Sequence, residues 1–346
     1  MSKFTDFIPE NIATTDAQMI GVYNASGNKV GNIQLGKLAP KSNGQKLYSF
    51  GALSDIHIGE NTADSDYISA LTWLSSNVEF IVEDGDLIHG DASKSEAQII
   101  SYIECRKNAS VPVYAVAGNH DAAYVSNIEN RISSYTGQPL YYSFERGNDV
   151  FIMVGIKSNG RTESLFADGE LQWLYETLET NRNKRCFVFQ HVRPDDSCGN
   201  ALGIYTNDIW WNVTVNGVTY YDQTVFEGLM KHYKNAHFFH GHSHIKFDLQ
   251  KYDDRANIGK DFGGWSIHIP SLSVPRDTTS AVNPSIVNVY AESEGYVVDV
   301  YENGIHLKGR DFIKGEYLPT ASYWLDTTLV NVPEKTYVDS TGTITV

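Results

Sequence analysis

The chain has 346 residues, of which 41% are hydrophobic and 20% charged, a balance typical of a folded globular protein rather than a disordered one. Its formal net charge of −15, with no long lysine or arginine run, argues against nucleic acid as a partner. The three cysteines (Cys105, Cys186 and Cys198) form neither a disulfide framework nor a C-x-x-C zinc pair. Because no window reaches ~18 apolar residues and the first residues lack an apolar stretch, we expect neither membrane insertion nor a signal peptide.

The first 45 residues differ from the rest of the chain. They are polar and rich in glycine and asparagine, and they contain two short strand-like pieces, MIGVYN and KVGNIQLG. The NASGN turn between these pieces predicts a small hairpin, and APKSNGQK is typical of a linker. We therefore expect a small N-terminal β or attachment segment over residues 1–45.

From Tyr48 onward, apolar runs alternate with helical stretches, as in an α/β fold. The runs expected to form strands are YSFGALS, VEFIVED, VPVYAVAG, VFIMVGI, CFVFQ and AHFFH. One helix is expected in DGELQWLYETLETN, with apolar residues at helical spacing and Asp168 as its N-cap, and others over roughly 64–76 and 223–233.

After residue 265 the pattern changes to successive strands: WSIHIPSLS, SIVNVYAES, GYVVDVYE and GIHLKGRDF. Asn303-Gly304 predicts a tight hairpin between the last two. The stretch from about Lys335 is expected to be a polar tail or a short edge hairpin. We divide the chain into the segment 1–45, a main domain over 46–320 and an extension over 321–346.

The main functional signal is the kind of residue that follows each apolar run. Residues able to bind metal come directly after five of them, as listed here: Asp55 and His57 in SDIHIG, Asp86 in EDGDLIHG, Asn119, His120 and Asp121 in AGNHD, His191 in FQH, and His242 and His244 in HGHSH. Ligands gather beyond the carboxyl ends of strands in open α/β sheets, so we expect one common site. Seven oxygen and imidazole ligands suit two first-row divalent ions such as Mn, Fe or Zn, bridged by one carboxylate.

This order of D-x-H, GD, GNHD, a lone histidine and GHxH resembles the calcineurin-like metallophosphoesterases over about residues 48–315, particularly the branch with cyclic-nucleotide and glycerophosphodiester phosphodiesterases. The resemblance implies a four-layer fold of the α/β (α+β) class, with two mixed sheets flanked by helices. It also implies two metal shells. The first comprises Asp55, His57, Asp86 and His244, and the second Asp86, Asn119, His191 and His242.

The same resemblance implies a hydrolytic mechanism, in which a metal-bridging hydroxide attacks phosphorus. His120 corresponds to the family's catalytic histidine, and we expect Asp121 to hydrogen-bond and orient it. No ligand position of the pattern is missing, so nothing indicates an inactive site.

Other residues near these motifs leave alternatives open. His89 and His240 could each support a metal ligand from outside or contact the substrate, or they could have no role in the site. Asn200 is a candidate substrate-binding residue. We expect His237 and His268 to be packing or outer-shell residues, and Asp84 and Asp91 to cap turns. The stretch 197–224, with Trp210, Trp211, Tyr220 and Tyr221, forms either a lid or a hairpin sealed onto the domain.

We therefore expect a phosphoester hydrolase, with a phosphodiester or phosphomonoester as substrate. One alternative is a repair-type nuclease, which the acidic charge disfavours. Another alternative is a phage-encoded, virion-associated structural or binding protein. It would act on host-surface phosphodiesters such as teichoic acid and would assemble or oligomerise through its N-terminal segment. The expected location is the cytoplasm, or the virion in that last case.

Overall fold

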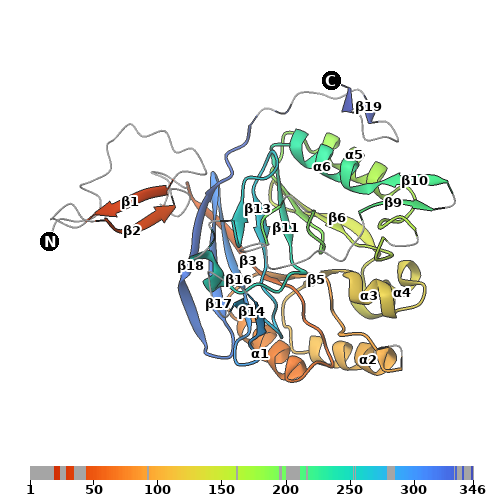
Figure 1. Ribbon diagram of the computed structural model, residues 1–346, viewed down its shortest axis with the longest axis horizontal. Helices are drawn as coiled ribbons and strands as arrows, with labels where there is room; N and C mark the ends of the chain where they lie inside the picture. The colour runs from red at the N-terminus through yellow and green to blue at the C-terminus, as the bar shows by residue number, and fades with distance from the viewer. Residues whose placement is uncertain are drawn as a thin grey trace.

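The structure is a computed structural model that describes residues 19–23, 29–34, 44–91, 93–160, 163–194, 197–199, 211–215, 217–251, 253, 255–278, 285–330, 332, 337–338 and 344–345. No helix in these ranges is long and apolar enough to cross a membrane. Figure 1 shows two large sheets side by side, with helices on their outer faces. This is the mixed α/β architecture that the resemblance implies.

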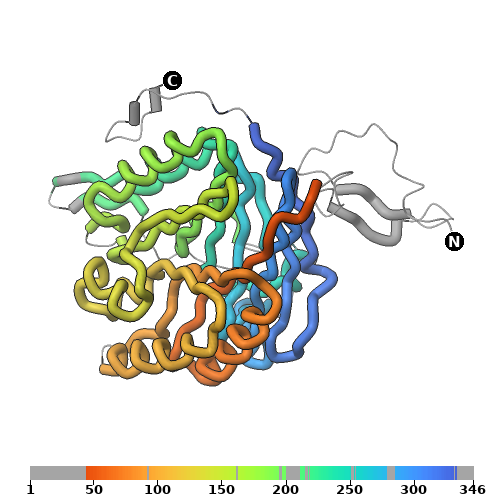
Figure 2. The backbone as a smooth tube through the Cα atoms, turned by 180° about the vertical axis from the view of Figure 1, so that it is seen from behind, coloured from red at the N-terminus to blue at the C-terminus, as the bar shows by residue number. Residues whose placement is uncertain are grey.

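The first sheet has six strands in the order β18 (Glu316–Asp326), β17 (Gly304–Asp311), β16 (Glu294–Tyr301), β3 (Lys46–Leu53), β4 (Phe80–Asp84) and β5 (Val113–Val116). Strands β3, β4 and β5 are parallel, whereas β16, β17 and β18 form an antiparallel meander. Figure 2 shows the meander, near the end of the chain, beside β3 at the start of the domain. The β16–β17 hairpin turns at Asn303, as predicted.

The second sheet has the order β12 (Ile258–Gly259), β13 (Ser266–His268), β11 (Ala236–His240), β8 (Cys186–Phe189), β7 (Asp149–Val154) and β6 (Tyr141–Arg146). Its four central strands are parallel, and β6 and β12 pair antiparallel at the edges. Among the described residues there are also two-stranded pairs: β1 (Met19–Tyr23) with β2 (Lys29–Gln34), β9 (Asn212–Val215) with β10 (Val218–Tyr221), β14 (Arg276–Thr278) with β15 (Ile286–Asn288), and β19 (Tyr337–Val338) with β20 (Ile344–Thr345).

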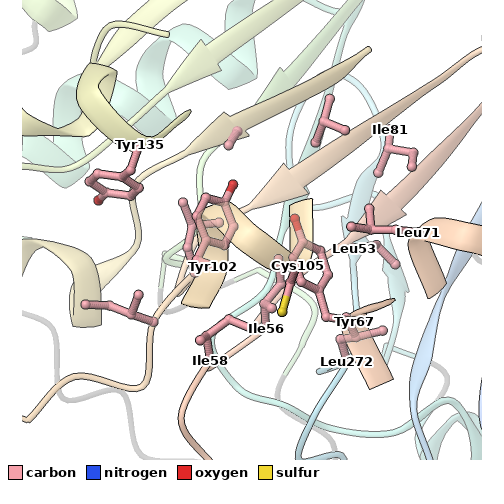
Figure 3. Packing of buried hydrophobic residues seen from close by; sticks show 14 of the residues in the cluster. Leu53, Ile56, Ile58, Tyr67, Leu71, Ile81, Tyr102, Cys105, Tyr135 and Leu272 are labelled. Atoms are coloured by element: carbon pink, nitrogen blue, oxygen red, sulfur yellow. The ribbon is translucent and has the colours of Figure 1, made fainter. Parts of the chain in front are cut away.

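Helices cover both outer faces. The described helices are α1 (Ala63–Ser75), α2 (Ser95–Arg106), α3 (Asn119–Tyr124), α4 (Ile128–Thr136), α5 (Glu170–Thr180) and α6 (Asp222–His232), with a 3-10 turn at Phe247–Lys251. Helices α1, α2 and α4 share a core with the first sheet, where Figure 3 shows Tyr67, Tyr102 and Tyr135 among aliphatic side chains. Helices α5 and α6 cover the second sheet.

Strand periodicity explains the core between the sheets. Alternate residues of a strand point to opposite faces, so Phe50, Phe80, Phe151, Phe187 and Phe239 all meet between the sheets while their neighbours face the helices. Phe50 stacks on Phe80 at 5.4 Å between ring centroids and meets Phe151 edge-on at 5.3 Å. These aromatic contacts fix the two sheets against each other, and with them the strand ends that carry the site.

Two local predictions are wrong. Asp168 does not cap α5, because Gly169 stands at the cap position with φ of 80° and the side chain of Asp168 is fully exposed. Instead, Glu170 accepts a hydrogen bond from the backbone N–H of Ala167 at 3.0 Å. Asp84 caps no turn either, since its buried carboxylate has no hydrogen-bond partner in the described part of the chain. Asp91 does cap a turn, accepting from the N–H of Ser93 at 2.9 Å.

The N-terminal hairpin is confirmed as β1–β2, whereas most of the expected linker falls outside the described residues. The boundary placed between residues 320 and 321 falls inside β18, whose Ala321, Tyr323 and Leu325 are buried between the sheets. The strand therefore continues the first sheet beyond that point. The division of the chain into domains otherwise stays a prediction.

Candidate metal centre

The parallel strands bring the predicted ligands to one edge of the two sheets. Asp55 and His57 follow β3, Asp86 follows β4, His191 follows β8, and His242 and His244 follow β11, while Asn119 begins α3 just after β5. Backbone hydrogen bonds tie these loops together: the N–H of Asp55 donates to the Gly85 carbonyl at 3.1 Å, and that of His57 to the Asp86 carbonyl at 2.9 Å. Within the second sheet, the N–H of Gly241, just after β11, donates to the carbonyl of His191, just after β8, at 3.0 Å.

The backbone at these loops is strained. Seven non-glycine residues in the described ranges have positive φ, and five of them are predicted ligands: Asp55, His57, Asp86, His242 and His244, with φ between 50° and 69°. Each such residue costs on the order of 1–3 kcal/mol, and strain of this kind concentrates at functional sites. The surrounding fold therefore stabilises a conformation that these residues would not adopt alone.

Close approach explains the glycines that precede the ligands. A Cβ atom on Gly118 would collide with Oδ1 and the backbone nitrogen of Asp86, and one on Gly241 would collide with the side chains of Ser54 and Asp55. Both glycines have ordinary φ values. The space, rather than the conformation, requires glycine at these two positions.

Each aspartate divides its two oxygens between the protein and the site. Oδ2 of Asp55 accepts from Ser54 Oγ at 2.7 Å and from the N–H of His242 at 3.0 Å, while Oδ1 lies 2.9 Å from Nε2 of His244. Oδ1 of Asp86 accepts from the N–H of His120 at 2.8 Å, while Oδ2 lies 3.2 Å from Nε2 of His191. One oxygen of each carboxylate is thus fixed and the other faces the histidines.

Two histidines are oriented by backbone carbonyls. Nδ1 of His191 donates to the carbonyl of Asp84 at 2.6 Å, and Nδ1 of His244 donates to that of Val274 at 3.1 Å. Because a carbonyl only accepts, these nitrogens carry the ring protons, and the Nε2 lone pairs face the site. This is the usual arrangement of metal-binding histidines, whose second nitrogen is fixed by a protein acceptor.

Three groups of described side chains could hold a metal ion, and two of them are fully buried; the third, His57, His89 and His120, is partly exposed. Potential ligand atoms lie within 4.8 Å of one another in the set Asp55, His57, Asp86 and His244 and in the set Asp86, His191 and His242. Both sets are buried, and Asp86 belongs to both. Oδ1 of Asn119, buried without a hydrogen-bond partner among the described residues, adds a further oxygen donor. A buried polar atom without a partner costs free energy unless something binds it. This set of oxygen and imidazole ligands suits a first-row divalent ion.

Electrostatics support the same interpretation. Burial raises the pKa of Asp55 and Asp86, but neighbouring histidine charges, His244 and His191 above all, outweigh it and lower both pKa values well below their usual range. Burial lowers the pKa of His191, yet Asp86 and Asp55 outweigh it and raise the value to about 10. Burial also lowers the pKa of His57 to about 3. Without an ion, positive charge on neighbouring histidines keeps both carboxylates ionised, and a bound cation would take over that role while the histidines bind it through neutral Nε2 atoms.

The predicted catalytic residues fall in different places. The ring of His120 faces the cavity, and its Nδ1 is held by the carbonyl oxygen of His89. Asp121 does not orient that ring: its Oδ2 accepts from the N–H groups of Gly118 at 2.9 Å and Leu87 at 3.1 Å. The expectation of an Asp121–His120 hydrogen bond is therefore wrong. Asp121 instead joins the two loops that carry Asp86 and Asn119, and burial together with Asp86 raises its pKa to about 7.

Outer residues settle some of the open alternatives. His89 lines the cavity and pairs with Glu60 at 3.0 Å. His240 and His237 are buried outside the ligand set. Buried His268 contacts the ligand turn from outside the ligand set. Its Nε2 lies 2.9 Å from Oγ of Ser243, the residue between the ligands His242 and His244.

The stretch 197–224 is described in part. Trp211 is buried against Phe226, and β9–β10 forms a hairpin, which supports the sealed-hairpin alternative for residues 211–221. Tyr220 and Tyr221 line a separate cavity beside α5. Asn200 and Trp210 lie outside the described residues.

Sequence reasoning missed part of the cavity wall. The site opens into a cavity of about 500 Å³, and the lining residues that no motif indicated are Glu60, Val274, Arg276, Ile286 and Asn288. Four of them come from the region after residue 273. The sequence predicts strands there but does not indicate that these strands lie close to the metal ligands. Among these five residues, the one signal is the positive charge of Arg276, which suits a site for phosphate oxygens.

The family model described as calcineurin-like phosphoesterase matches residues 48–246, more than half of the chain, and the chain therefore belongs to this family. Family members are metal-dependent, in keeping with the histidine and aspartate clusters. No curated protein matches the chain in sequence.

Two solved structures share the fold. Purple acid phosphatase PPD1 from yellow lupin (Lupinus luteus) seeds is 13% identical with a TM-score of 0.51, over 89% of this chain and 59% of that one. GAP50, the anchor in the inner membrane complex of Plasmodium, is 16% identical with a TM-score of 0.52, over 82% of this chain and 89% of that one. This chain thus spans about three fifths of the lupin protein.

Proposed function

We propose that the chain is a dinuclear metal-dependent phosphoesterase that hydrolyses a phosphodiester. The observation that carries the proposal is the pair of buried ligand clusters that share Asp86, with their free oxygens and Nε2 atoms facing one another. GAP50, the anchor in the inner membrane complex of Plasmodium, has the same fold, so the fold alone does not identify an enzyme. The complete ligand set supports one.

The first ion would be held by Asp55, His57, Asp86 and His244, and the second by Asp86, Asn119, His191 and His242. Mn, Fe and Zn suit these donors. Such ions supply Lewis acidity, which lowers the pKa of water and polarises a phosphoryl oxygen. The protein supplies rigid placement, because backbone groups fix the remaining oxygen of each aspartate.

His120 is the group that would act directly on the substrate. Its ring is about one third exposed and faces the cavity, with Nε2 3.9 Å from Oδ2 of Asp86. Because the His89 carbonyl accepts from Nδ1–H, Nε2 is left for the substrate, and with a proton on both ring nitrogens it would donate to a phosphoryl or leaving-group oxygen. A positioned donor of this kind accelerates such reactions by roughly 10²–10⁴-fold.

The shape of the cavity favours a diester. A second polar cavity of about 600 Å³ lies next to the first, and Glu60 and His89 line both. A diester has two substituents on phosphorus and needs room on two sides, whereas a monoester needs room on one. A nuclease is disfavoured by the net charge of −15.

A hydrolysis panel tests the proposal. Protein stripped by a chelator and reconstituted with Mn²⁺, Fe²⁺ or Zn²⁺ is assayed on bis(4-nitrophenyl) phosphate, 4-nitrophenyl phosphate, a cyclic nucleotide and a glycerophosphodiester. We expect metal-dependent turnover, faster on diesters than on the monoester. No turnover with any metal would refute the enzyme, and a preference for the monoester would refute the diester proposal.

A further inference from the structure

Arg276 lies beside the turn that carries two of the proposed ligands. Its backbone N–H donates to the carbonyl of His244 at 2.7 Å. Its side-chain Nη1 lies 3.4 Å from the carbonyl oxygen of Ser243, the residue between His242 and His244. The half-buried guanidinium is therefore placed next to the metal centre, and it lines the same cavity.

Asn288 presents a second polar side chain from the neighbouring strand. Arg276 and Asn288 are direct partners in the antiparallel β14–β15 pair, so their side chains lie on the same face. Both line the cavity, together with Ile286, two residues before Asn288 on the same face of β15. This strand pair thus offers a guanidinium and an amide side by side.

The charge distribution distinguishes Arg276 from the other cations nearby. Among the described residues that line the cavity, it is the only lysine or arginine. Lys246, whose backbone N–H donates to the carbonyl of Arg276, instead directs its ammonium to Glu292 and Asp277. A planar guanidinium with several donors suits the oxygens of a phosphoryl group, to which it can donate twice.

We propose that Arg276 and Asn288 form an anion subsite that binds a non-bridging oxygen of the phosphoryl group. This inference rests on the proposed function and adds substrate-binding residues to it. The subsite lies on β14–β15, outside the ligand loops, and determines how tightly the anionic phosphorus centre is held before hydrolysis.

A purely structural role for Arg276 makes a different prediction. If its contact with the Ser243 carbonyl only braces the ligand turn, removing the guanidinium should loosen His242 and His244 and release metal. If the guanidinium binds substrate, the metal should stay and affinity for phosphate should fall. Metal content and phosphate affinity together therefore separate the two roles.

The experiment uses full-length Mn²⁺-reconstituted protein and inorganic phosphate as a competitive inhibitor of diester hydrolysis. Arg276→Met keeps the apolar stem of the side chain and removes the charge. Arg276→Lys restores the charge without the planar donor fork, and Asn288→Ala removes the amide. Lys107→Met is the matched control, since Lys107 is an exposed cation that pairs with Glu104 and lines neither cavity.

We expect Arg276→Met to retain its metal and to raise both the phosphate Ki and the substrate KM by about 10- to 100-fold, as for the loss of a charge-assisted hydrogen bond. Arg276→Lys should recover part of this loss, Asn288→Ala should show a smaller one, and Lys107→Met should match the wild type. Metal loss from Arg276→Met, or an unchanged Ki, would overturn the subsite. If Arg276→Met does not fold, Arg276→Lys and Asn288→Ala decide by the same readouts. An inactive wild type would instead refute the proposed function, and titration calorimetry of phosphate would still test the subsite.

Discussion

The backbone N–H of His120 donates to Oδ1 of Asp86 at 2.8 Å, which leaves Oδ2 of the same carboxylate 3.2 Å from Nε2 of His191. The residue proposed to act on the substrate thereby fixes the residue proposed to bridge the metals. This relationship follows from the GNHD turn, where α3 begins shortly after β5 and the N–H of its second residue, His120, reaches Asp86.

Asp86→Asn should remove both metals. The amide keeps the size of the side chain and an acceptor for the His120 N–H, but it loses the charge that both clusters share. Elemental analysis after dialysis should show metal content falling from about two ions per chain towards none. Asp91→Asn, at an exposed turn, is the control and should retain the wild-type content. Full retention of one ion in Asp86→Asn would show that Asp86 is not a shared ligand.

His120→Asn should keep the metals and lose about 10²–10⁴-fold in kcat, because the ring lies on the cavity side of Asp86 rather than among the buried ligands. Steady-state kinetics and metal analysis on the same sample test this. Tyr135→Phe, a buried change in the helical core that lines neither cavity, serves as the control. A wild-type rate in His120→Asn would remove this residue from the mechanism.

His268→Leu should weaken metal binding. His268 accepts from Ser243 through Nε2 and donates to Oδ1 of Asn257 at 3.1 Å, so it holds the strained turn between His242 and His244. Loss of such outer contacts typically lowers metal affinity about 10- to 100-fold, which chelator competition measures. His237→Leu, equally buried in the same sheet, is the control. Equal losses in both variants would indicate general packing instead.

Glu294→Gln should change the pH dependence of stability. Burial, the largest cause, raises the pKa of this carboxyl to about 8 in the folded protein, against 4.5 for the ordinary group. Its contribution to folding is therefore fully present below about pH 4.5 and is lost as the pH rises to about 8. A glutamine never ionises and still accepts from the N–H of Phe247, as Glu294 does at 2.8 Å.

Urea unfolding at pH 5 and pH 8.5 measures this effect. The variant should gain stability over the wild type at pH 8.5 by on the order of 1–3 kcal/mol, with a much smaller difference at pH 5. The exposed Glu316→Gln provides the control and should show no such divergence. A constant difference between Glu294→Gln and the wild type across this range would contradict the assigned ionisation.

The sequence predicts the central strands well because their signal is strong. Runs such as CFVFQ and AHFFH are buried on both faces, so nearly every residue is apolar. Helix α2 escaped prediction because its buried face includes Ser95 and Gln98, which blur the helical pattern. Strand β6 also escaped prediction. It is a partly exposed edge strand, so its sequence lacks a continuous apolar run.

The ligand residues could be predicted, but the way they are held could not. Motif order places Asp55 and His242 at strand ends, yet their positive φ values and the hydrogen bond between them arise from contacts 187 residues apart. The Asp121 prediction failed for the same reason, because its carboxylate binds the N–H of Leu87 on another loop rather than its neighbour His120. Such long-range partners leave no local pattern.

The central claim is that two ions share Asp86, and anomalous diffraction from crystals of Mn²⁺- or Zn²⁺-reconstituted protein tests it most directly. We predict two peaks about 3.5–4 Å apart, one bounded by Asp55, His57 and His244 and the other by Asn119, His191 and His242, with Asp86 between them. A single peak, or two peaks that do not share Asp86, would contradict the claim.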